Sequence, residues 1–104
     1  MIETVEYKRH FYPKFQTEGN ASQFAIPFAQ HVCKGYGYDI GCMKKEWALP
    51  NAQAIDLDFD DPWDADNLPE GVSPDYIFSS HCLEHVPDWV ATMDYWYEKL
   101  REGG

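Results

Sequence analysis

Two short apolar runs decide the fold: residues 38–42 read Tyr-Asp-Ile-Gly-Cys, and residues 52–56 read Ala-Gln-Ala-Ile-Asp. Each predicts a short buried strand, the first turning at a glycine and the second ending in an acid. About ten residues separate them, near the lower limit for a parallel crossover. We therefore expect two neighbouring parallel strands joined by at most one or two helical turns.

A third strand and an amphipathic helix follow. Residues 75–79 read Asp-Tyr-Ile-Phe-Ser, after an Asp- and Pro-rich stretch, 57–74, that predicts a long loop. Asp88 is placed to cap a helix, and Gly103 to end it in the left-handed conformation. The apolar positions of this helix follow the 3.6-residue period and are Trp89, Val90, Met93, Trp96, Tyr97 and Leu100. We expect its aromatic stripe in the core, and a homodimer could form through any exposed part of this stripe or through the unfinished sheet.

The N-terminal third gives a weaker signal. Residues 1–19 are polar and aromatic without clean periodicity, so we expect residues 1–21 to form an irregular arm whose aromatic side chains dock elsewhere. A helix is expected over roughly 22–34, because Phe24, Phe28 and Val32 recur at four-residue spacing and share a face.

Length and charge narrow the function classes. The 104 residues allow one domain at most. The net charge is -10, and residues 51–104 hold two Lys/Arg against thirteen Asp/Glu, so nucleic-acid and membrane-surface binding are disfavoured. The chain therefore favours a small-molecule substrate. An odd set of cysteines, no targeting segment and no apolar run of membrane-spanning length predict a cytoplasmic protein.

Strand, glycine turn, strand ending in an acid, further strand and helix form the layout of a Rossmann-like nucleoside site. Four segments in this order resemble motifs of class I S-adenosylmethionine-dependent methyltransferases of the type 11 kind. They are the glycine motif 38–42, the adenine segment 64–69, the fourth-strand motif 75–86 and the Gly-Gly turn 100–104. The resemblance implies that residues 22–104 form a partial domain, with a parallel sheet flanked by helices, compressed and C-terminally truncated.

The resemblance also implies S-adenosylmethionine as cofactor and a set of residues around it. Asp39 would orient the methionine end, and Gly41 would let the backbone approach. Asp56 would accept the ribose hydroxyls, as the acid beyond a glycine turn does in dinucleotide folds. The Asp64 carboxylate and the Ala65 amide would read the adenine edge. The complete set of expected cofactor-binding residues is Asp39, Gly41, Cys42, Asp56, Asp64, Ala65, Ser80 and His81.

Catalysis would consist mainly of in-line positioning of an unidentified small acceptor, with His81 or His85 as candidate base.

Two alternatives to the methyltransferase interpretation stay open. Met43 and Lys45 stand where the glycine motif normally has further glycines, which favours a non-catalytic binding or assembly module with a degenerate site. The pattern His81-x-x-Glu84-His85 also fits one class of zinc peptidase, which would need both histidines on one helix and a third ligand. We expect no metal.

Overall fold

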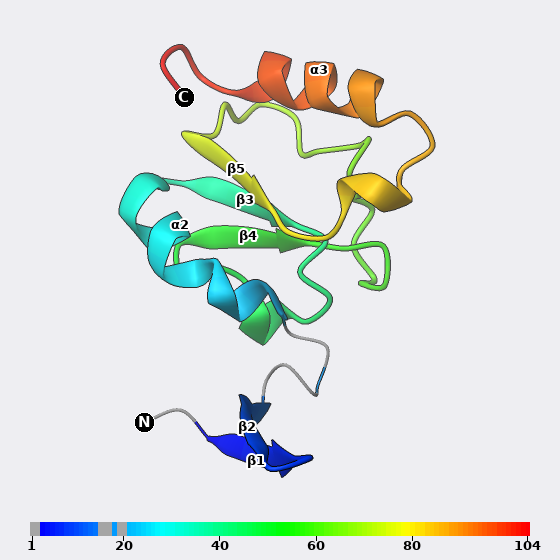
Figure 1. The fold of residues 1–104 in the computed structure, drawn as a ribbon. Helices are drawn as coiled ribbons and strands as arrows, with labels where there is room; N and C mark the ends of the chain where they lie inside the picture. Colours follow the sequence, from blue (N-terminus) through cyan, green and yellow to red (C-terminus); the bar gives the residue numbers. More distant parts are fainter. Residues whose placement is uncertain (1–2, 15–17, 19–20) are drawn as a thin grey trace.

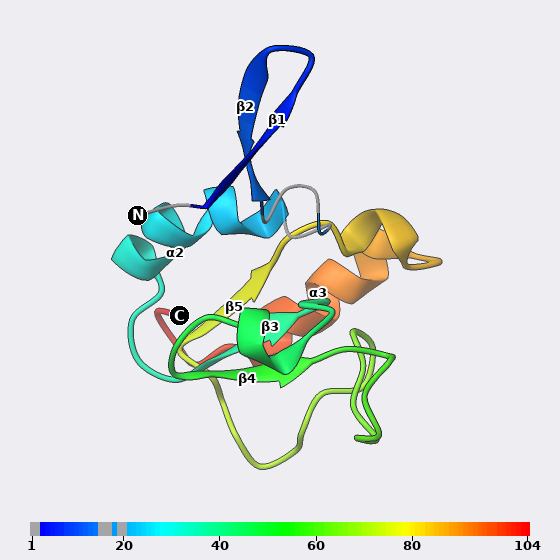
Figure 2. The ribbon, with the colours of Figure 1, turned by 90° about the horizontal axis from the view of Figure 1, so that it is seen from below.

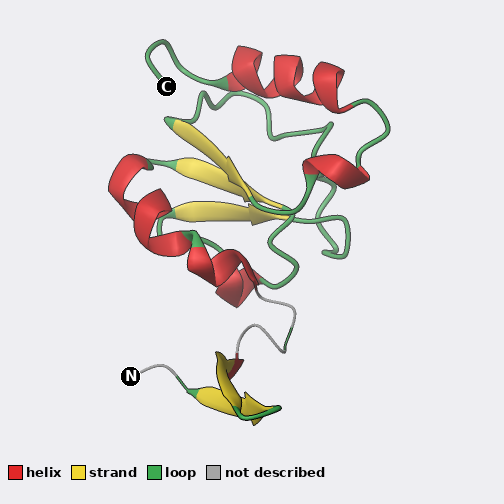
Figure 3. Ribbon diagram, in the orientation of Figure 1, coloured by secondary structure: helices red, strands yellow, loops and turns green. Residues whose placement is uncertain are grey.

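The computed structural model describes residues 3–14, 18 and 21–104. Within these residues, a two-stranded hairpin precedes an α/β unit with three further strands (Figure 1, Figure 3). With η marking short 3-10 helices, the elements are β1 (Thr4–Tyr7), β2 (His10–Pro13), η1 (Ala21–Phe24), α2 (Ile26–Val32), β3 (Gly37–Ile40), η2 (Lys45–Trp47), β4 (Ala52–Ile55), β5 (Tyr76–Ser79), η3 (Leu83–His85) and α3 (Trp89–Lys99).

The three later strands form a parallel sheet in the order β4-β3-β5. In register, Ile40 at the end of β3 lies opposite Ile55 of β4 and Ser79 of β5, so all three strands end at the same edge. Gly41, at φ 81°, turns the chain out of the sheet and ends β3 two residues earlier than expected. The predicted α/β, Rossmann-like parallel sheet is confirmed.

Both faces of the sheet are covered. Because side chains alternate along a strand, Tyr38 and Ile40 of β3 pack with Leu68 and Trp96 on one face. On the other face, Ala29 of α2 packs with side chains of β5 and of the segment between β3 and β4. Figure 2 shows α2 on one side of the sheet and the long loop between β4 and β5 on the other.

The C-terminal helix α3 begins where the sequence predicts, but it ends at Lys99, with extended backbone at Leu100, so Gly103 does not end it as expected. The Asp88 side chain accepts a hydrogen bond from the Ala91 N–H at 3.1 Å, and Gly103 has φ 81°. The expectation of a buried aromatic stripe is right only for Trp96, since Trp89 and Tyr97 are 56% and 77% exposed. The buried side chains of α3 are Thr92 and Trp96, so the rings of Trp89 and Tyr97 face outward. A homodimer through these rings stays a prediction.

The expected helix over 22–34 is two shorter helices, η1 and α2, with Pro27 in the first turn of α2. Its buried position is Ala29, whereas Phe24, Phe28 and Val32 are all more than half exposed. The small Ala29 side chain lets α2 lie close to Leu49 and Tyr76. The hydrophobic periodicity therefore predicted a helix correctly, but it predicted the wrong face of that helix to be buried.

The expectation of an irregular N-terminal arm is wrong for the described residues, because β1 and β2 form an antiparallel hairpin. A two-residue turn joins them, with Lys8 at φ 50° and Arg9 at φ 67°. Neither residue is a usual choice for positive φ, so this turn could not be predicted from its residue types. Phe11 is 71% exposed.

Among the helices in the described part of the chain, none combines the length and the apolar composition of a membrane-spanning helix.

Candidate functional site

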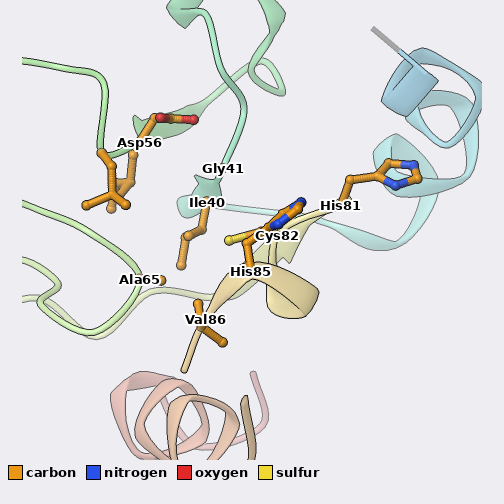
Figure 4. A pocket seen from close by; sticks show the side chains of 10 residues that line it. Ile40, Gly41, Asp56, Ala65, His81, Cys82, His85 and Val86 are labelled. Carbon is orange, nitrogen blue, oxygen red and sulfur yellow. The ribbon is translucent and has the colours of Figure 1, made fainter. Parts of the chain in front are cut away.

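A cavity of about 200 Å³ opens at the carboxyl ends of the three parallel strands. This is where open α/β sheets bind ligands. Its volume lies below the roughly 300–1,000 Å³ usual for small-molecule pockets, so it can enclose only part of a nucleoside-sized ligand. Figure 4 shows side chains from different loops meeting there. Those that carry the argument are Gly41, Asp56, Ala65, His81, Cys82 and His85.

Gly41 directly follows β3 and lines the cavity. Its N–H donates to the Ile55 carbonyl oxygen at 2.7 Å. A Cβ on this residue would come within 2.7 Å of the Cys82 Cβ, and its φ of 81° suits glycine. Glycine is therefore required here by both conformation and space, because the Cys82 side chain packs against it.

Asp56 follows β4 directly and joins two loops at the cavity. One carboxylate oxygen accepts the Met43 N–H at 2.8 Å, and the other accepts the Asp58 N–H at 3.0 Å. Each carboxylate oxygen has a further lone pair, so the group can still accept hydroxyl donors from a ligand. The carboxylate is thus oriented by the backbone before any ligand arrives.

The departure at Met43 changes the glycine motif less than the sequence suggests. Met43 has φ 72°, so it adopts the left-handed conformation that a glycine would supply at that position. For a residue with a side chain this conformation costs roughly 1–2 kcal/mol. The hydrogen bond to Asp56 compensates, and the loop keeps a turn beside the cavity.

Asp39 does not lie with the other expected cofactor residues. It is only 3% exposed, does not line the cavity, and its carboxylate accepts the Leu49 N–H at 3.0 Å. Burial raises the pKa of Asp39 to about 6, although the hydrogen bond from Leu49 lowers it. In the structure Asp39 therefore fixes the loop after β3.

Cys42 is buried as well and is not among the cavity-lining residues. Burial, followed by the nearby carboxylates of Asp39 and Asp56, raises the pKa of the Cys42 thiol to about 12. Its thiol therefore keeps its proton at neutral pH and behaves as a small core group.

Of the adenine segment, only Ala65 reaches the cavity. Asp64 and Asn67 pair through two backbone hydrogen bonds of 3.1 and 3.2 Å, and the Asp64 carboxylate accepts the Asp66 N–H at 2.8 Å. The indole N–H of Trp96 donates to the Ala65 carbonyl oxygen at 2.7 Å. Helix α3 thus positions this tight turn at the rim of the cavity.

The loop after β5 supplies the opposite side of the cavity. The Ser79 hydroxyl donates to the Ile40 carbonyl oxygen at 2.9 Å, which ties β5 to β3, whereas Ser80 does not line the cavity. His81, at φ 59°, and Cys82 do line it. Burial raises the pKa of the Cys82 thiol, and hydrogen bonding to Ser79 opposes this.

Sequence reasoning did not single out Leu57 and Val86, which give the cavity an apolar lining. Each directly follows a residue that was considered, Asp56 or His85, and its apolar character in a polar loop was the available signal. Apolar lining suits a flat ring, because orientation is then left to a few polar groups.

The described residues contain no group of three side chains placed to hold a metal ion. His85 ends the single turn of η3, and His81 lies before that turn with positive φ. The two histidines therefore do not share a continuous helix, and the zinc-peptidase alternative lacks its structural requirement.

Comparison with known protein families is consistent with this geometry. A family model described as a methyltransferase domain matches residues 18–104. Neither the comparison with curated proteins nor the comparison with solved structures gave a match.

Proposed function

The chain belongs to the methyltransferase domain family, and from that premise we propose that it binds S-adenosylmethionine at the carboxyl ends of β3, β4 and β5 and supports methyl transfer to a small acceptor. The carrying observation is Asp56, an oriented carboxylate at the end of β4, beside Gly41. An acid in this place suits the two ribose hydroxyls of a nucleoside.

The cavity residues suit such a cofactor by their chemistry. Gly41 lines the cavity without a side chain, and Asp56 offers two acceptor oxygens. The turn at Ala65 and the apolar Val86 offer contacts for a flat base. When bound, the cofactor supplies an electrophilic methyl group on a positively charged sulfur, and the chain contributes orientation of the reacting partners. Asp39, Asp64 and Ser80 do not line the cavity and enter this proposal only as residues that shape neighbouring loops.

Calorimetric titration with S-adenosylmethionine and S-adenosylhomocysteine tests the proposal. Asp56→Ala should weaken both affinities roughly 10- to 100-fold, since a hydrogen bond to a charged group contributes about 1.5–3 kcal/mol. Asp60→Ala removes an exposed acid of the same loop and should leave both affinities unchanged. Circular dichroism of both variants excludes unfolding as the cause. Equal affinities for the wild type and a folded Asp56→Ala variant would overturn the ribose role.

One observation favours a second candidate, a non-catalytic binding or assembly module. Met43 is 55% exposed beside the cavity, where a glycine would leave more room. A folded wild-type sample that binds neither ligand would favour this second candidate over the first.

We also propose a cytoplasmic location. All three cysteines, Cys33, Cys42 and Cys82, are free, which suits a reducing compartment. Thiol labelling of protein extracted under non-reducing conditions should find all three reactive once the chain is unfolded, whereas a disulfide would count against the proposal.

A further inference from the structure

The N-terminal hairpin is largely uncovered by the rest of the described chain. Of the residues in β1 and β2, only Val5 and Pro13 are partly buried. Val5 lies opposite Tyr12, and Tyr7 is two residues beyond Val5, so the two tyrosine rings share one face of the hairpin. Both rings are exposed. A two-stranded hairpin is at best marginally stable alone in water, so further packing is needed to hold it.

The outer face of α3 carries an apolar stripe. Val90, Met93 and Tyr97 recur at spacings of three and four residues, so they lie on one side of the helix, and all three are exposed. The exposed acids Asp94 and Glu98 directly follow Met93 and Tyr97 and therefore lie beside this stripe. An exposed apolar patch rimmed by polar groups is typical of a surface that binds another protein.

The hairpin and the α3 stripe have complementary charge. Lys8 and Arg9 form the turn between β1 and β2, and the Lys8 ammonium lies 5.3 Å from the centroid of the Tyr7 ring. The hairpin thus presents cations next to aromatic rings, whereas acids flank the α3 stripe. The exposed apolar side chains of α2 lack such acids, because residues 21–35 contain Lys34 and no Asp or Glu. Charge therefore favours α3 over α2 as the surface that receives a hairpin.

Within one chain, the hairpin and α3 lie at opposite ends of the molecule and do not meet (Figure 1). We propose that the hairpin of a second copy of this chain covers the α3 stripe, with its tyrosine face on the apolar side chains and its cationic turn beside the acids. Two copies related by a two-fold axis make this contact twice, once in each direction, which closes the assembly as a dimer. The dimer does not depend on the cofactor proposed above.

Charge reversal followed by mixing tests this contact, with sedimentation velocity of the full chain as the measurement. The hairpin variant is Lys8→Glu/Arg9→Glu, and the helix variant is Asp94→Lys/Glu98→Lys. The wild type should sediment as a dimer. Either variant alone brings like charges together at both contacts, which should raise the dissociation constant of its dimer roughly 100-fold. In an equal mixture, each hairpin meets a helix of opposite charge on the other variant, so a heterodimer should form.

The control variant is Glu46→Lys/Asp60→Lys, which makes the same change of charge at exposed positions outside α3 and should dimerise as the wild type does. Circular dichroism establishes that every variant is folded. A monomeric wild type, folded charge-reversed variants that still dimerise, or an equal mixture that stays monomeric would each overturn the proposal. Loss of the dimer on Phe28→Lys, with the helix variant still dimeric, would place the contact on α2 and overturn it as well.

Discussion

Asp39 belongs to the glycine motif, but its buried carboxylate holds the loop after β3 through the Leu49 N–H. Because its pKa is about 6 in the folded chain and near 4 when unfolded, the folded state binds the proton more tightly. Between about pH 4 and 6 the free energy of unfolding should therefore fall as pH rises, by about 3 kcal/mol. Asp39→Asn keeps an acceptor for the Leu49 N–H and removes the charge.

Urea unfolding of the wild type and Asp39→Asn at pH 4, 5, 6 and 7 checks this prediction. The variant should be the more stable protein at pH 7, and its advantage should shrink toward pH 4. Asp60→Asn, at an exposed position, should show no such trend. A constant difference between the wild type and Asp39→Asn across this range would show that the buried charge is not destabilising.

Met43 gives the second prediction at the residue scale. Met43→Gly removes a side chain from a left-handed backbone and should raise the free energy of unfolding by about 1 kcal/mol. Lys45→Gly, in the first turn of η2, should lower it instead. Urea unfolding at one pH compares the two, and a loss of stability on Met43→Gly would contradict the assigned strain.

At the scale of elements, the turn after β3 requires glycine for close packing as well as for conformation. Gly41 and Gly71 have nearly equal positive φ, 81° and 78°, but a Cβ on Gly71 would meet nothing within 4 Å. Gly41→Ala should therefore destabilise the chain more than Gly71→Ala, by roughly 1–3 kcal/mol. Thermal or urea unfolding of both variants measures this difference. Equal losses of unfolding free energy in the two variants would mean that Cys82 can move away from the added Cβ without destabilising the chain.

The connection between α3 and the rim of the cavity is also testable. Trp96→Phe removes the hydrogen bond to the Ala65 carbonyl oxygen and should lower the free energy of unfolding by about 1 kcal/mol. It should also weaken binding of S-adenosylhomocysteine, because the turn at Ala65 loses its support. Trp89→Phe, at a position 56% exposed, is the matched control and should change neither quantity. Similar effects from both substitutions would contradict a specific role for Trp96.

The sequence predicted elements well where local rules decide them. The strands and the cap at Asp88 follow from short-range chemistry, whereas α3 ends at Lys99 and not at the predicted glycine stop, Gly103. The buried face of α2 depends on how closely that helix approaches the sheet, and Ala29 allows an approach that a hydrophobic pattern does not reveal. The turn at Lys8 and Arg9 uses residues that rarely adopt positive φ, so it gave no signal.

For the whole molecule, parallel topology gathers residues that are distant in sequence. The segments after β3, β4 and β5 meet because the three strands end at one edge. The sequence therefore predicted Gly41, Asp56, Ala65 and His81 as neighbours of one cavity. It could not show that Asp39 points to the other face, since a shift of one residue along a strand reverses the side chain.

Titration of the ¹⁵N-labelled full chain with S-adenosylhomocysteine tests the central claim most directly, because each backbone amide reports on its own surroundings. We predict the largest chemical-shift changes at the amides of Gly41, Met43 and Ala65, around the cavity, with Ala29 of α2 unaffected. Changes confined to α2 or the N-terminal hairpin, or no changes at saturating ligand, would contradict a cofactor site at the carboxyl ends of the sheet.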